Sequence, residues 1–119
     1  MPRTAIPVQE IEGNANEEIV YTAGDAANDM LFQNNGRTLL ICKNGSVGAI
    51  QLTIVSVPDP VLGRTEDIVQ SIPAGDDFIV GFLKPSGWNQ KSGADAGKVY
   101  VNLDDDTSVS VAALSIKGA

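Results

Sequence analysis

The chain has 119 residues and a net charge of −7, with eight Lys and Arg against fifteen Asp and Glu. This length suits one domain, and folding at this size removes roughly two-thirds of the unfolded chain's surface from water, which supports an ordinary core. The few scattered cations argue against wrapping of DNA or RNA, which normally requires a basic stripe.

The sequence contains no histidine. This excludes Ser-His-Asp and Cys-His nucleophilic catalysis and removes the commonest zinc ligand. The single cysteine, Cys42, cannot form an intramolecular disulfide and lies in an apolar run, so we expect a buried, inert thiol. The first residues lack the apolar stretch of a signal peptide, and no run reaches the roughly 18 apolar residues of a membrane helix. We therefore expect a protein made in the cytoplasm that contacts neither nucleic acid nor membrane.

Residues 1–16 are predicted to form an extended N-terminal arm. Two prolines disfavour helix, and Ile6, Val8 and Ile11 supply apolar side chains along the arm. The arm ends at the turn-like residues 13–16. It can pair with a sheet edge of its own domain or with that of a neighbour, and in the second case Ile6, Val8 and Ile11 are interface residues.

Residues 17–119 are predicted to form a single domain of about eight short strands, because Gly, Pro, Asn and Asp separate β-rich runs and no apolar helical period exceeds one turn. The run at 39–42 is apolar on both faces, which predicts a central strand, and the run at 78–83 is a second strand that is apolar on both faces. The apolar phase shifts between Ala113 and Leu114, which indicates a β-bulge. This pattern favours an all-β fold, a β-sandwich or a jelly-roll-like barrel. The predicted strands are 18–22, 30–33, 37–43, 50–55, 67–72, 78–83, 99–103 and 109–116.

The sharpest acidic cluster is the run Asp104, Asp105 and Asp106. Adjacent carboxylates can bind a hard cation such as calcium, but Asp is also an ordinary turn residue, so we expect a solvated turn and leave cation binding open. A pair of carboxylates could serve a glycosidase, but a sugar cleft usually shows more aromatic residues than one Trp, two Tyr and three Phe. The glycines at 45–48 and 93–97 match no phosphate-binding motif. The sequence thus predicts no catalytic, metal or cofactor site, and no enzyme.

Trp88 lies in a polar loop between Gly87 and Asn89. A tryptophan in such a loop either covers one end of the core or anchors an interface, and both alternatives stay open here. A carbohydrate-binding module would need exposed aromatic side chains on one sheet face, and Tyr21, Tyr100 and Trp88 are the candidates.

A series of short motifs follows one order through residues 30–116. The motifs are NGRTLLICKN at 35–44, IQLTI at 50–54, GRTEDI at 63–68, IPAGD at 72–76, FIVGFL at 78–83, WN at 88–89, VYV at 99–101 and VSVAAL at 109–114. This series resembles the small head proteins of tailed bacteriophages that decorate, or cement, the major capsid shell. The resemblance implies a β-sandwich on the outside of the assembled capsid, often as a trimer, and it assigns no catalytic residue.

From these observations we expect a non-enzymatic virion structural protein. It would bind the major capsid protein on the outer capsid surface and stabilise contacts between capsomers, after synthesis in the host cytoplasm. Two alternatives remain: a tail, head–tail joining or fibre-associated protein on the same fold, and a carbohydrate-binding β-sandwich.

Overall fold

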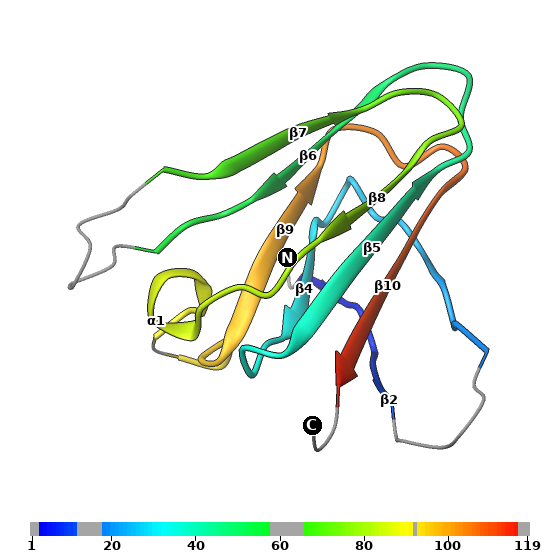
Figure 1. The fold of residues 1–119 in the computed structure, drawn as a ribbon. Coiled ribbons are helices and arrows are strands. Elements are labelled where there is room, and N and C mark those ends of the chain that lie inside the picture. The colour runs from blue at the N-terminus through cyan, green and yellow to red at the C-terminus, as the bar shows by residue number, and fades with distance from the viewer. Residues whose placement is uncertain (1–2, 12–17, 58–65, 92, 117–119) are drawn as a thin grey trace.

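A computed structural model describes residues 3–11, 18–57, 66–91 and 93–116. The strands are β1 (Thr4–Ala5), β2 (Val8–Ile11), β3 (Thr22–Ala23), β4 (Met30–Gln33), β5 (Thr38–Asn44), β6 (Ile50–Ile54), β7 (Ile68–Ile72), β8 (Asp77–Val80), β9 (Lys98–Leu103) and β10 (Val109–Ile116). They form two sheets, so the predicted all-β, sandwich-like fold is confirmed (Figure 1). The first sheet has the order β1-β4-β9-β6-β7; the second has the order β2-β10-β5-β8, with β3 also beside β10.

Helix is limited to one short turn in the described residues, α1 (Pro85–Trp88). Pro85 at its start has the fixed φ that suits a first helical position. No helix in this part of the chain is long and apolar enough to span a membrane.

The N-terminal segment contributes a strand to each sheet of its own domain. β1 pairs in parallel with β4, and β2 pairs in parallel with β10. Ile6 lies between the two strands, donates its backbone N–H to the Leu31 carbonyl at 2.8 Å, and is only 2% exposed. Residues 3–11 are therefore part of the sandwich, the first of the two alternatives for the arm, whereas the predicted turn at 13–16 lies outside the described residues.

The core lies between the two sheets and follows the alternation of the sequence. Along β6, Ile50, Leu52 and Ile54 are buried and Gln51 is exposed. Removal of such side chains from water stabilises the fold by roughly 25 cal/mol per Å² of apolar surface. The fully or nearly buried apolar residues of this core are Ile6, Met30, Phe32, Leu40, Cys42, Ile50, Leu52, Ile54, Ile72, Leu83, Trp88, Val99, Val101, Leu103, Val109, Val111 and Ala113.

A buried pair of asparagines joins the end of β4 to the loop that carries α1. The Asn34 side-chain amide donates to Oδ1 of Asn89 at 2.7 Å and to the Leu83 carbonyl at 2.9 Å. The Asn89 amide donates in return to the Asn34 carbonyl at 2.8 Å. These bonds satisfy polar groups that would otherwise be costly to bury.

The predicted bulge near Ala113 and Leu114 is absent. β10 pairs with β5 in one unbroken antiparallel register from Val109 opposite Asn44 to Ser115 opposite Thr38. The apolar phase shifts because β10 carries buried side chains on both faces over this stretch, so the strand itself needs no extra residue.

The second run that is apolar on both faces, 78–83, forms an edge strand. β8 spans Asp77–Val80 and pairs with β5, at the edge of the second sheet. Its second apolar side faces outward, where Ile79 is 65% exposed. The run 39–42, by contrast, does lie inside its sheet, since β5 stands between β10 and β8.

Candidate functional site: an apolar sheet face

The two sheets differ on their outer faces. An antiparallel sheet with one face in water normally alternates apolar and polar residues, with the polar ones outside. The first sheet obeys this rule, apart from Leu31 and Val69. Its outward polar residues are Gln33, Gln51, Thr53, Ser71, Lys98, Tyr100 and Asn102.

The outer face of the second sheet is apolar in three successive rows. The register places Ala112, Ile41 and Ile79 side by side across β10, β5 and β8. The next row pairs Leu114 with Leu39, beside Gln9 on β2, and the row after it pairs Ile116 with Ile11. We call these seven apolar residues the apolar face: Ile11, Leu39, Ile41, Ile79, Ala112, Leu114 and Ile116.

The apolar face ends at a polar row. Ser110, Lys43 and Asp77 lie side by side at the end of the sheet where β8 begins. Water can solvate these polar groups at the end of the sheet. The charged side chains of Lys43 and Asp77 therefore lie beside the apolar face and not within it.

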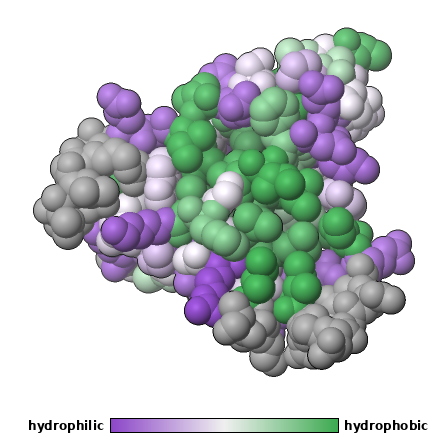
Figure 2. Space-filling view, viewed as in Figure 1, coloured by the Kyte–Doolittle hydropathy of each residue, from purple (hydrophilic) through white to green (hydrophobic). Residues whose placement is uncertain are grey.

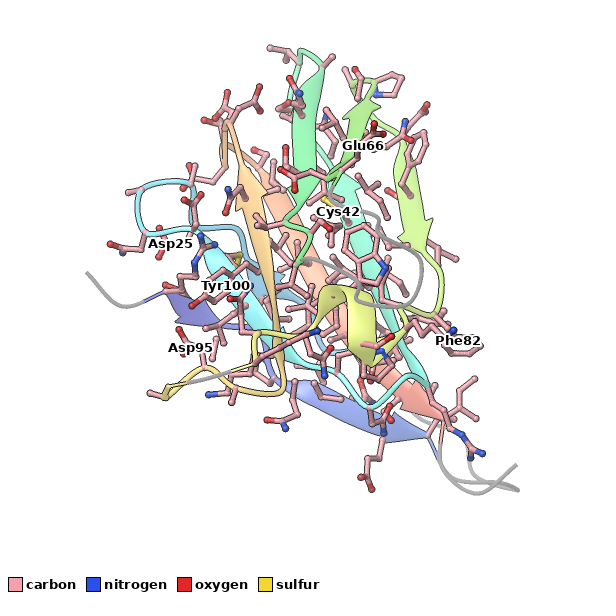
Figure 3. All side chains as sticks on the ribbon, turned by 90° about the vertical axis from the view of Figure 1, so that its left-hand side faces the viewer. Asp25, Cys42, Glu66, Phe82, Asp95 and Tyr100 are labelled. Carbon is pink, nitrogen blue, oxygen red and sulfur yellow. The ribbon has the colours of Figure 1, made fainter. Side chains whose placement is uncertain are left out.

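Two members of the apolar face are exposed to solvent in the single chain, Ile79 at 65% and Ile116 at 37%. The other five are half-buried (Ile11, Leu39 and Ile41) or buried (Ala112 and Leu114). Ile79 is the most exposed member, and Phe82, just beyond β8, is 55% exposed. Figure 3 shows Phe82 on the opposite side of the molecule from Tyr100. Figure 2 shows a continuous hydrophobic area over β5, β8 and β10. The exposed parts of these side chains amount to an area on the order of 400 Å², taking about 200 Å² for a fully exposed large apolar side chain.

Residues 18–21 border the apolar face along β2 and β10. The Gln9 side chain donates to the Glu18 carbonyl at 2.8 Å and accepts the backbone N–H of Val20 at 3.2 Å. The Lys43 ammonium lies 4.8 Å from the centre of the Tyr21 ring. These contacts explain why β3 begins only at Thr22 although the run 18–22 is β-rich: the preceding residues bond to a side chain.

The predicted interface residues fall into three places. Ile6 and Trp88, 2% and 8% exposed, belong to the core and offer almost no surface to another chain. Val8 is partly buried against the core. Ile11 is half-buried on the apolar face.

The three carboxylates of the acidic turn each accept a backbone N–H. Asp104 accepts from Gln51 at 2.8 Å, Asp105 from Thr107 at 3.0 Å and Asp106 from Ala26 at 2.9 Å. Hydrogen bonds from Thr107 lower the pKa of Asp105. The three carboxylates thus bond to backbone N–H groups in β6, in the turn itself and in the loop after β3, as Asp residues in turns commonly do. Within the described ranges, no group of three or more His, Cys, Asp or Glu side chains could hold a metal ion.

The aromatic candidates for a sugar platform do not share a surface. Trp88 is in the core, and the Arg3 guanidinium covers the Tyr100 ring at 3.9 Å from its centre. The Tyr100 hydroxyl donates to Asp95 at 2.6 Å, on the first sheet, while Tyr21 borders the second. This separation removes the row of stacking faces that a sugar would need.

Cys42 lies on the inner side of β5 and is fully buried. Burial raises the pKa of its thiol to about 11, with a further contribution from the charge of Asp77. A thiol in this environment is neutral at physiological pH and is not a nucleophile.

A hollow of about 340 Å³ lies at one end of the sandwich, between the turns 45–49 and 105–108. Glycine, serine and other small residues line most of it, and Asp105 is its one acidic group. The Asp105 carboxylate already accepts the Thr107 N–H, so the hollow shows no set of converging polar groups of the kind that fixes a ligand.

The sequence pattern of the runs at 39–42 and 78–83 is also consistent with an apolar outer face. Ile41 and Ile79 lie in the two runs that are apolar on both sides, and for the run at 39–42 that pattern indicated a central strand. The same pattern arises when the outer face of a strand is covered by another protein. Comparisons with models of known protein families, with curated proteins and with solved structures find no match to this chain.

Proposed function

We propose that the protein is a non-enzymatic structural protein of a tailed-bacteriophage head, which binds the outside of the capsid and stabilises contacts between capsomers. The observation that carries the proposal is the apolar face. Extended apolar patches on soluble proteins mark surfaces that other proteins cover. The order of motifs through residues 30–116, which resembles that of phage decoration proteins, supplies the phage context.

The placement of the reactive groups supports a structural role. The carboxylates of the acidic turn hold backbone N–H groups, the Cys42 thiol is buried, and the Tyr100 hydroxyl is bonded to Asp95. These groups are therefore engaged in hydrogen bonds that hold the fold, or are buried within it. Binding to another protein, by contrast, requires only a suitable surface such as the apolar face.

A decoration protein stabilises a shell by adding contacts across the joints between capsomers. Many copies bind one particle, so modest contacts per copy add up through avidity. Residues 3–11 are already paired within their own domain. We therefore expect the sandwich to bind as a preformed unit, with its apolar face covered by protein in the assembled particle.

The test is co-sedimentation with expanded heads from the matching phage, prepared without this protein. We expect saturable binding at a fixed ratio to the major capsid protein. Ile79→Lys places a charge on the apolar face and should reduce binding at least tenfold, an estimate typical of a buried interface position. Val69→Lys is the matched control, because Val69 is also a β-branched edge-strand residue, 55% exposed, but on the outer face of the first sheet.

Absence of binding to the matching heads by the wild-type chain would contradict the proposal. Tail or head–tail joining complexes should then be tested in the same assay, since the apolar face would suit contacts there as well. Equal loss of binding in both lysine variants would show that charge alone, and not the apolar face, governs binding.

A further inference from the structure

We propose that the apolar face packs against the same face of a second copy of this chain. The inference concerns which partner covers the face, and it holds whether or not the assembly belongs to a phage head.

The composition of the apolar face favours a permanent contact between copies. Interfaces that form and dissociate are about as apolar as the rest of a protein surface, whereas contacts within homo-oligomers are more apolar and depleted in charge. The three rows of the face carry seven aliphatic residues and one polar side chain within them, Gln9, which is bonded to residues 18 and 20. The charged Arg37 ends the third row, where its carbonyl accepts the Ile116 N–H.

The area of the face fits a stable pair. A standard interface buries about 800 Å² on each partner, of which roughly 500 Å² is apolar in homo-oligomers. The apolar face and Phe82 expose on the order of 400 Å² by the same estimate as above. The bordering residues Ile19, Val20 and Tyr21 are also exposed and raise the apolar area to the required range.

The distribution of charge also suits a second copy. The chain carries −7, yet the outward side of the described rows of this sheet holds one carboxylate, Asp77, beside the Lys43 ammonium. Arg37 adds a second cation opposite Ile116, and Glu10 falls on the other side of β2 by alternation. The acidic turn belongs to the β9–β10 connection, and Asp95 bonds to Tyr100 on the first sheet. A partner that used a basic surface would be expected to meet carboxylates, and this face does not present a cluster of them.

The geometry allows the contact without burial of charge. Two sheets pack face to face at a separation of about 10 Å with interdigitated side chains. A two-fold relation makes one face complementary to itself. The row of Ser110, Lys43 and Asp77 then lies at one rim and the exposed Arg37 at the other, where water can solvate them.

The experiment is the mass of the full-length chain in solution, by sedimentation equilibrium over a wide range of concentration. We expect a multiple of the 12.4 kDa chain mass. Ile79→Lys should raise the dissociation constant roughly 30-fold or more, as the charging of a buried interface residue does. Phe82→Ser should weaken association as well, and because Phe82 lies outside the strand this variant should keep the wild-type circular dichroism. Val69→Lys should associate like the wild type.

A wild-type chain that stays monomeric would overturn the inference, as would an oligomer that neither Ile79→Lys nor Phe82→Ser weakens. These outcomes are distinct from failure of the proposed function. A monomer that binds phage heads would leave the proposed function standing, and an oligomer that binds no head would leave the present inference standing.

Discussion

Replacement of Ile6 by alanine tests whether the N-terminal segment is part of the folded domain. Ile6 is 2% exposed and belongs to the core that both sheets enclose. An Ile→Ala change at such a site removes transfer free energy and leaves a cavity, at a cost of about 2–5 kcal/mol. Since small domains unfold with about 5–15 kcal/mol, this loss is a large fraction of the total.

The assay is urea unfolding followed by circular dichroism, at one protein concentration because self-association would also stabilise the fold. We expect a clear decrease in the midpoint for Ile6→Ala. Val47→Ala is the control, since Val47 is fully exposed in the turn after β5 and its truncation should change stability by less than about 0.5 kcal/mol. A wild-type midpoint for Ile6→Ala would refute the packing of residues 3–11 and favour an arm that serves a neighbouring chain.

Three further predictions concern buried or bonded polar groups. Asn34→Ala should destabilise the domain by roughly 1–3 kcal/mol in the same urea assay, because Asn89 loses its buried partner; an unchanged midpoint would contradict the buried pair. The Cys42 thiol, with a pKa of about 11, should resist an aromatic disulfide reagent near neutral pH and react at once in denaturant, whereas rapid reaction of the native protein would show that β5 is open. The hydrogen bond to Asp95 raises the pKa of Tyr100, so Asp95→Ala should lower the pH at which the phenol ionises in an ultraviolet titration. The stabilisation linked to Tyr100 is complete below its unfolded pKa of about 10 and is lost as pH rises through the folded value; an identical titration of both proteins would exclude the bond.

Local pattern was sufficient for most strands. β4 and β10 begin and end at the predicted residues, and β6 ends one residue early. The alternation in β6 and β9 also gives the correct inner face. These predictions succeed because the side-chain period of a strand is two residues and one face of each of these strands meets the core.

Most of the predictions that failed concern what covers the second side of a strand. Periodicity shows that Ile79 and Leu114 are apolar, but it does not show whether a layer of this chain, a bordering segment or another protein lies over them. The same limit applies to the N-terminal segment, because alternate apolar residues suit pairing with either chain. It applies also to Trp88, whose loop is polar in sequence although α1 turns the indole into the core.

Heat capacity offers a final test of how the apolar face is covered. Since burial of apolar surface lowers the heat capacity, dilution calorimetry at several temperatures should give a negative heat-capacity change for association. Sulfate should strengthen the contact, because it favours apolar burial, and it also screens repulsion between two acidic chains. A heat-capacity change near zero would show that the copies meet through polar groups, and would direct attention to the first sheet instead.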